Sequence, residues 1–165
     1  MVPQDAFLFS DSIKNNIKFG NENATDEEVI HFAKMADVHK NIEKFEKKHE
    51  TVLGERGLTL SGGQKQRVSI ARALIKNPNI LLLDDCLSAV DTETEETILN
   101  NLEKLTKDKT TIIVTHRVSS AKNADMIIIL EDGEIIEQGS HSELINQNGY
   151  YKDLYSKQLS EKDIA

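Results

Sequence analysis

The chain lacks several features that mark particular classes of protein. Its 165 residues include a single cysteine, Cys86, so neither an intrachain disulfide nor a cysteine metal cluster can form, which suits a reducing compartment such as the cytosol. The longest apolar run, residues 126–130, falls far short of the roughly 20 residues that a membrane-spanning helix needs. The N-terminus has no basic-then-apolar signal pattern. We therefore expect any membrane role to depend on a partner or on further polypeptide.

Positive charge is scarce as well. Twenty Lys and Arg stand against 28 Asp and Glu, which gives a formal net charge of -8, and no long basic stripe is present. Nonspecific binding to nucleic-acid phosphates is therefore disfavoured. The 38% of hydrophobic and 29% of charged residues fit a globular protein that faces water, and the length suits one domain with a buried core.

Apolar spacing and capping signals predict an alternation of helices and strands. Thr25 and Glu28 form a capping box at the start of one helix, and Ser140 with Glu143 starts another in the same way. Asp132-Gly133 is typical of a hairpin turn between two strands. Further helices are expected over residues 39–48, 64–76 and 92–107, and strands over residues 80–83, 110–115, 126–130 and 134–137. The continuous apolar runs of the first two strands predict burial on both faces, as in a parallel βαβ unit.

A glycine-rich turn, Ser61-Gly62-Gly63-Gln64, opens the helix over residues 64–76. Adjacent glycines let backbone N–H groups approach an anion, and a helix N-terminus adds partial positive charge. The Ser61 hydroxyl can donate a further hydrogen bond. The alternative is that the two glycines merely cap a helix, and Ser-Gly-Gly alone does not separate the two hypotheses.

Two acids follow the first buried strand. Asp84 and Asp85 stand at the strand tip, where open α/β sheets bind ligands, and carboxylate oxygens suit Mg²⁺. A solvated strand end is the alternative. His116 follows the second strand, a position at which a lone histidine is more often structural. The other histidines have no spacing that suggests a metal site and are expected at the surface: His31, His39, His49 and His141.

The context of these residues is more specific than the residues alone. The run GERGLTLSGGQKQRVSIARAL, residues 54–74, resembles the signature segment of the ATP-binding-cassette (ABC) ATPases at nearly every position. Residues 80–85 resemble the Walker B strand of that family, residues 88–91 its D-loop, residues 114–117 its switch histidine and residues 2–5 its glutamine loop. The resemblance extends from Val2 to about Leu154. Residues 4–13, 54–57 and 124–144 are similar to the exporter branch in particular.

The resemblance implies a role for each matching position. Asp84 and Gln4 would bind Mg²⁺, Asp85 would orient the attacking water, and His116 would contact the γ-phosphate. Ser61, Gly62, Gly63 and Gln64 would bind ATP held by a partner subunit, and Ser88 and Asp91 of the D-loop would reach across to that subunit. Gln4, Glu55 and Arg56 would couple the domain to a transmembrane partner.

The implied fold is α/β, a P-loop NTPase-like ABC ATPase core with helices flanking a parallel sheet, an α-helical signature subdomain, and no N-terminal strands. We expect the helical subdomain over about residues 10–78, the C-terminal part of the core over about 79–154, and a tail over 155–165. The implied function is the ATP-binding and hydrolysing module of an exporter, with ATP and Mg²⁺ as cofactors. Its partners would be a second ABC ATPase domain, arranged head to tail, and a transmembrane domain at the cytoplasmic face of the cell membrane, without nucleic acid.

Two departures from the family pattern qualify this function. Asp85 stands where hydrolytically strong members have Glu, and the loss of one methylene retracts the carboxylate by roughly 1.5 Å, which suggests a degenerate, weakly hydrolysing cassette with a regulatory role. The chain also contains no Gly-x-x-x-x-Gly-Lys-Ser/Thr loop. We therefore expect the 165 residues alone to be inactive and to expose apolar surface beside the two buried strands. A soluble ABC ATPase acting on DNA or ribosomes is a third hypothesis, disfavoured by the acidic charge.

Overall fold

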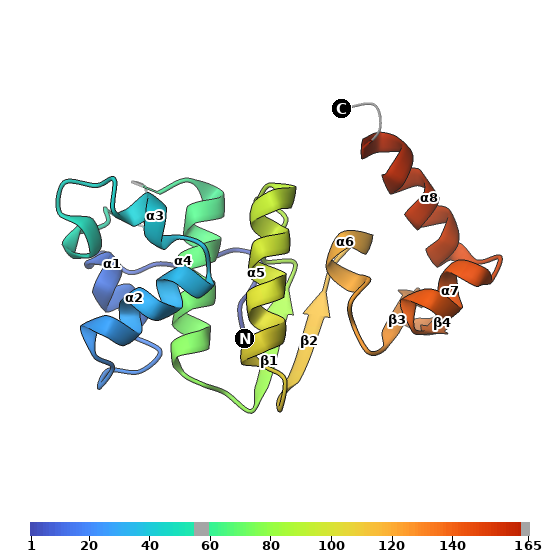
Figure 1. Cartoon of the computed structure of the whole chain (residues 1–165), viewed down its shortest axis with the longest axis horizontal. Helices are drawn as coiled ribbons and strands as arrows, with labels where there is room; N and C mark the ends of the chain where they lie inside the picture. Colours follow the sequence, from blue (N-terminus) through green and yellow to red (C-terminus); the bar gives the residue numbers. More distant parts are fainter. Residues whose placement is uncertain (55–59, 163–165) are drawn as a thin grey trace. The chain divides into compact units, whose positions relative to one another are not determined.

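The computed structural model describes residues 1–54 and 60–162 (Figure 1). The chain divides into two compact units, Met1–Val114 and Thr115–Ala165, which we describe separately. Among the described residues, none of the helices has both the length and the apolar composition needed to cross a bilayer.

The first unit contains most of the helices. They are α1 (Ile13–Lys18), α2 (Asp26–Met35), α3 (His39–Ile42), the 3-10 helix η1 (Lys48–Glu50), α4 (Gly62–Ile75) and α5 (Thr92–Leu105). The predicted capping box at Thr25 and Glu28 is confirmed at the start of α2. α4 packs against α1 and α2, and its buried residues join the main hydrophobic core.

The helix predicted over residues 39–48 was wrong. The helix α3 forms only one turn and ends at Ile42, and a series of turns then leads to η1. Only Ile42 and Phe45 of this stretch pack on the core, which is too little apolar contact to hold a longer helix in a run of charged residues. Lys48 then adopts a left-handed backbone conformation, with φ of 46°, that the helix could not accommodate.

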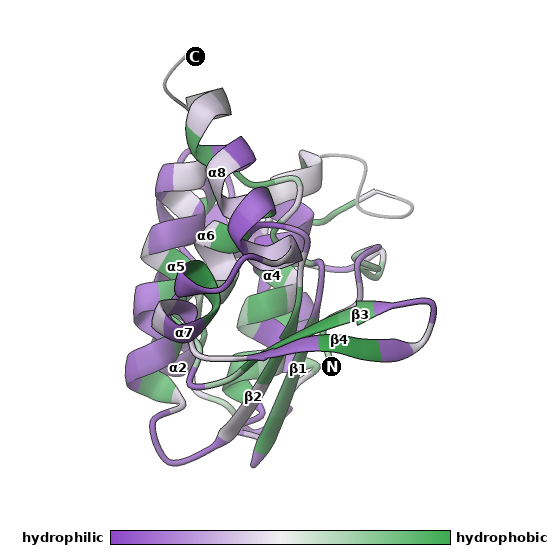
Figure 2. Ribbon diagram, turned by 90° about the vertical axis from the view of Figure 1, so that its right-hand side faces the viewer, coloured by the Kyte–Doolittle hydropathy of each residue, from purple (hydrophilic) through white to green (hydrophobic). Residues whose placement is uncertain are grey.

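A parallel strand pair forms the sheet of this unit. β1 (Ile80–Asp84) pairs in parallel with β2 (Thr110–Val114), so that Asp84 lies opposite Val114, and α5 makes the predicted crossover. Val2 forms an isolated parallel bridge with Leu83 and extends the pairing beyond β1. Figure 2 shows the hydrophobic character of β1.

The expectation that both strands are buried on both faces was only partly right. Leu81 and Leu83 of β1 are buried, but Ile112 and Val114 of β2 remain 49% and 50% exposed. Burial along β2 alternates with period two, so only one of its faces is covered. The expected apolar surface therefore lies on β2.

The second unit is a hairpin with helices. It comprises α6 (Val118–Ala121), β3 (Ile127–Glu131), β4 (Glu134–Gly139), α7 (His141–Asn146) and α8 (Tyr150–Lys162). The predicted hairpin is confirmed, with positive φ at both Asp132 and Gly133 as a two-residue turn requires. The capping box at Ser140 is also confirmed. α8 continues as a helix through residues that we expected to form a tail.

The N-terminal segment is attached to α4 by a polar network. Arg72 donates through Nε to the Asn16 carbonyl and through Nη2 to Asn16 Oδ1, both at 2.8 Å. Asn16 in turn donates to the carbonyl of Phe9 at 3.0 Å. Gly20 lies close to the same turn of α4. A Cβ built at Gly20 would be 2.0 Å from the Arg72 carbonyl oxygen and 2.8 Å from Cγ2 of Ile75.

We therefore predict that Gly20→Ala destabilises the fold by about 1–3 kcal/mol, the usual cost of forcing an extra group into a packed contact. Urea unfolding measures the change. Gly54→Ala is the matched control, because a Cβ there meets no atom of the described residues within 4 Å, while both substitutions restrict the unfolded chain equally. Equal unfolding midpoints for the two variants would show that Gly20 does not need its close approach to α4.

Candidate functional site

The tip of β1 brings two sequence-predicted residues together. Because Val2 pairs with Leu83, Gln4 lies beside the end of the strand, and its Nε2 donates to Oδ2 of Asp85 at 3.2 Å. The backbone N–H of Asp85 donates to the Val114 carbonyl at 2.9 Å. Asp85 has a φ of 42°, so the chain turns sharply at this residue. Gln4 therefore contacts Asp85, and its grouping with Asp84 at a metal ion stays a prediction.

The glycine-rich turn is a capped helix start. Ser61 Oγ accepts from the Gln64 N–H at 3.3 Å, and Gln64 Oε1 accepts from the Ser61 N–H at 3.0 Å. The Gln64 side chain thus serves the helix cap. The Ser61 hydroxyl acts as an acceptor in this cap and keeps its own hydrogen as a donor. Ser61 and Gly62 are exposed, so capping is compatible with binding an anion at the same helix end.

The first turn of α4 packs on the D-loop, residues 88–91. A Cβ at Gly63 would be only 2.7 Å from the Ala89 carbonyl oxygen, whereas one at Gly62 would meet Ala89 Cβ at an ordinary 3.7 Å. Ser88 Oγ donates to the Asp85 carbonyl at 2.8 Å and closes the turn after β1. Gly63 is therefore required by the close approach of these two segments.

Asp91 ends the D-loop as the N-cap of α5. Its Oδ1 accepts from the Thr94 N–H at 3.0 Å. The hydrogen bonds from Thr94 lower the pKa of the Asp91 carboxyl, so it is ionised at neutral pH. The exposed side chain places a negative charge at the helix N-terminus, where the helix dipole favours it.

Gln66 is a site residue that sequence reasoning missed. Its buried side chain donates through Nε2 to the Gln4 carbonyl and accepts through Oε1 from the Ala89 N–H, each at 3.3 Å. One side chain of α4 therefore connects the glutamine loop to the D-loop. The available signal was a polar residue on the same buried helix face as Ser69 and Ile70.

Arg67 fixes the start of α4 on its other side. Its Nε donates to the Gly63 carbonyl at 3.3 Å, and its Nη1 donates to the Asp37 carbonyl and lies 3.5 Å from Asp37 Oδ2. Burial lowers the pKa of Arg67, yet a guanidinium stays protonated at neutral pH. The helix start is thereby tied to the corner that follows α2.

Other predicted site residues are not brought together in this way. His116 belongs to the second unit, where its carbonyl accepts from Gln158 Nε2 at 2.8 Å, and its role beside Asp85 stays a prediction. Glu55 and Arg56 lie outside the described residues.

Cys86 is buried beside the acids, and desolvation raises the pKa of its thiol to about 12. A thiol with that pKa is not a nucleophile at neutral pH.

The expectation that the remaining histidines lie at the surface was right for His31, which is exposed, but wrong for His39, His49 and His141, which are partly buried. His39 and His49, ten residues apart, have Nδ1 and Nε2 only 3.1 Å from each other. Both rings are partly buried. Burial first, and then repulsion by His39, lower the pKa of His49. The spacing in the sequence did not indicate this contact because a turn of the chain creates it.

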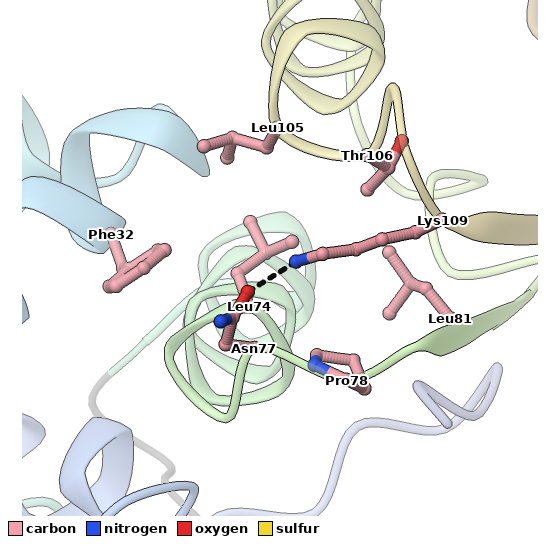
Figure 3. Close-up of a pocket in the computed structure, with 8 residues that line it drawn as sticks. All are labelled: Phe32, Leu74, Asn77, Pro78, Leu81, Leu105, Thr106 and Lys109. Atoms are coloured by element: carbon pink, nitrogen blue, oxygen red, sulfur yellow. Dashed lines mark hydrogen bonds between the residues drawn. The ribbon is translucent and has the colours of Figure 1, made fainter.

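A small hollow lies at the opposite end of β1 from Asp84. Its volume is about 60 Å³, and Figure 3 shows Lys109 reaching across it to Oδ1 of Asn77. Sites for small molecules usually measure about 300–1,000 Å³, so this hollow is too small for a nucleotide.

The strand tip with its two acids and the exposed start of α4 are better candidates for a ligand-binding site. Carboxylate and amide oxygens at the strand tip fit a hard cation such as Mg²⁺, and the helix start fits an anion.

Comparisons with known proteins agree on one family. A model of the ABC transporter family matches residues 1–88. ATP-binding cassette sub-family B member 6 of Xenopus tropicalis is 49% identical over 160 residues, which are 97% of this chain and 19% of that protein. A putative multidrug export ATP-binding/permease protein of Staphylococcus aureus is 51% identical over 158 residues, 96% of this chain and 27% of that protein.

The solved structures agree. A bacterial Atm1-family ABC exporter with ATP bound superimposes with a TM-score of 0.91 at 44% identity, over 95% of this chain and 28% of that one. The chain thus spans between about a fifth and a little over a quarter of the length of these relatives.

The contact of Gly63 with the D-loop yields a prediction about stability. Gly63→Ala should lower the free energy of unfolding by about 1–3 kcal/mol, because the new Cβ must displace backbone. Gly62→Ala, one residue earlier in the same turn, should be neutral or slightly stabilising. Chemical denaturation of the two variants compares them directly. If they unfold alike, α4 and the D-loop do not touch as closely as described.

Proposed function

Because the chain belongs to the ABC transporter family and has the fold of an ABC ATPase, we propose that it is the ATP-binding and hydrolysing module of an exporter. The observation that carries this proposal is the contact of Gln4 with Asp85 at the tip of β1, held in place by Gln66. It joins the residues needed for metal binding and water activation to the helix that bears the signature segment. ATP and Mg²⁺ would be the cofactors.

Within this proposed function, each residue of the strand tip would have a different role. Asp84 and Gln4 would hold Mg²⁺, which offsets negative charge on the phosphates. Asp85, hydrogen-bonded to Gln4, would orient the attacking water. His116 would contact the γ-phosphate.

The signature residues would act on a second nucleotide. Ser61, Gly62, Gly63 and Gln64 lie at the start of a 14-residue helix whose first residues are exposed, so the helix end can meet ATP held by a second ABC ATPase domain. The D-loop packs beside it through Ala89 and Val90, and its residues Ser88 and Asp91 would contact the same partner. This placement supports the proposal of a head-to-tail pair of ABC domains.

Coupling to a membrane partner is supported by an exposed aromatic cluster. Phe7 lies 5.0 Å from Phe9, and Phe9 lies 4.7 Å from Phe19, measured between ring centroids, and Arg72 stacks near two of the rings. Phe7 and Phe19 are more than half exposed. We propose that this cluster, with Glu55 and Arg56, docks on a transmembrane domain at the cytoplasmic face of the membrane.

Slow hydrolysis is a second candidate, favoured by one residue. Asp85 stands where strong hydrolases of the family carry Glu, and its shorter side chain is already engaged by Gln4. Under this hypothesis the domain binds ATP and closes on its partner but turns over slowly, in a regulatory role.

The main proposal predicts that Asp84→Asn in the full-length protein lowers the rate of ATP hydrolysis by about 100-fold or more, because even indirect partners of a metal contribute roughly 10–100-fold. Phosphate release at saturating ATP and Mg²⁺ measures it. Asp108→Asn is the matched control, since Asp108 is an exposed residue between α5 and β2, at the other end of the strands. Unchanged hydrolysis in Asp84→Asn would contradict the assigned role.

The slow-hydrolysis hypothesis predicts the opposite change at the neighbouring position. Asp85→Glu should raise ATP turnover, by up to about 100-fold, if about 1 Å of reach limits the reaction. The assay uses the assembled transporter with both ABC domains present. If turnover does not rise, the slow-hydrolysis hypothesis is wrong, and the main proposal is unaffected.

A further inference from the structure

Three side chains with metal-ligating atoms converge next to α3, away from the strand tip. His39 begins α3 and Glu43 caps its end, so an i to i+4 spacing places both on one face, as the hydrogen bond from the Glu43 N–H to the His39 carbonyl at 3.0 Å indicates. The chain then turns back, and η1 brings in His49. One ligand atom from each residue lies within 4.8 Å of the other two.

The separation of the two rings fits a shared metal ion. His39 Nδ1 and His49 Nε2 are 3.1 Å apart. Two imidazole nitrogens bound to one tetrahedral Zn²⁺, at bond lengths of about 2.0–2.1 Å, are roughly 3.3 Å apart. The rings therefore need to move by only a few tenths of an ångström to bind the same ion.

The hydrogen bond between the rings does not satisfy the cluster. Nδ1 of His49 is buried and has no hydrogen-bond partner among the described residues. Lys48 contacts Oε2 of Glu43 at 2.9 Å, and the carboxylate has a second oxygen with lone pairs to offer. The cluster thus retains unused ligand capacity.

The charges around the cluster are close to balanced. Asp26 and Glu50 lie close by and share Lys14, whose Nζ is 2.9 Å from one carboxylate and 3.0 Å from the other. With Glu43, Lys48 and Lys18, which also acts on Asp26, three carboxylates face three ammonium groups while the imidazoles are neutral. The binding of a cation therefore depends on the ligand atoms of the cluster and not on a surplus of negative charge around it.

We propose that His39, Glu43 and His49 form a binding site for a late first-row transition-metal ion, with Zn²⁺ as the best fit. Two imidazoles and one carboxylate are a donor set that zinc adopts in proteins, with water in the fourth position. Mg²⁺ and Ca²⁺ prefer oxygen ligands and are disfavoured. The site is independent of the proposed nucleotide chemistry.

The bound ion would join α3 to η1 across the turns between them. This segment leads directly into residues 51–53, which hydrogen-bond to the N-terminal segment: the Ile13 N–H donates to the Thr51 carbonyl and the Leu53 N–H donates to the Asp11 carbonyl, each at 3.0 Å. A metal bond would therefore hold a segment of turns that contacts the core only through Ile42 and Phe45.

Calorimetric titration of the full-length protein, free of a histidine tag, with ZnCl₂ tests the site. The wild type should bind one Zn²⁺ more than His39→Gln or His49→Gln, or bind it at least about 100-fold more tightly, since losing a direct ligand should cost at least as much as losing an indirect one. His31→Gln is the matched control, because it removes an exposed histidine of α2 and should bind as the wild type does. Equal stoichiometry and affinity in all four proteins would overturn the proposal.

Two further measurements keep the result decisive if a histidine variant fails to fold. Glu43→Gln alters an exposed side chain at constant volume and should also weaken Zn²⁺ binding. Hydrogen exchange should slow at residues 44–50 on addition of Zn²⁺ in the wild type and in His31→Gln, and stay unchanged in Glu43→Gln. Displacement of Zn²⁺ by equimolar Mg²⁺, or protection outside this segment only, would contradict a site built from imidazole nitrogens.

Discussion

The arrangement of the candidate site depends on one buried amide, that of Gln66. Its side chain lies between the Gln4 carbonyl and the Ala89 N–H and bonds to both. An amide buried without partners costs about 1–3 kcal/mol, so the two loops and the helix must stay in register for each to remain satisfied. Because the Gln4 backbone is held here, its side chain is directed at Asp85. Because Ala89 is held here, the D-loop stays against Gly63.

α4 is therefore both a carrier of candidate ligand groups and the element that positions the others. Its start meets the D-loop through Gly63, Arg67 ties the same turn to the corner at Asp37, and Arg72 near its end binds Asn16. Gly63 and Arg67, four residues apart, lie on the same face of the helix and reach two loops, whereas Arg72 reaches helix α1. Because closely packed segments transmit small displacements, a shift of one of these segments would change the position of the exposed turn at Ser61 and Gly62.

Local features of the fold were predictable from the sequence, and the long-range contacts were not. Capping boxes at Thr25, Ser61 and Ser140 involve residues three positions apart, so the pattern contains the whole interaction. The partners of Gln66 are 62 and 23 positions away, and no local pattern encodes them. The helix predicted over residues 39–48 failed because its periodicity looked sufficient while its apolar contacts were too few. That error also hid the approach of His39 to His49, which depends on the turn that replaces the helix.

Asp85, the residue directly after β1, meets a backbone requirement as well as a chemical one. Asp85 has a φ in the left-handed region, which Asp tolerates better than longer side chains because its short polar group can bond to nearby backbone. Its amide is held by Val114 and its carboxylate by Gln4, so the turn and the hydrogen bond together fix where the negative charge lies. A Glu at this position would carry the charge farther from the backbone but would lose part of that backbone preference and extend past Gln4. The shorter acid thus favours a fixed position of the charge over reach, and this difference is the structural basis of the slow-hydrolysis proposal.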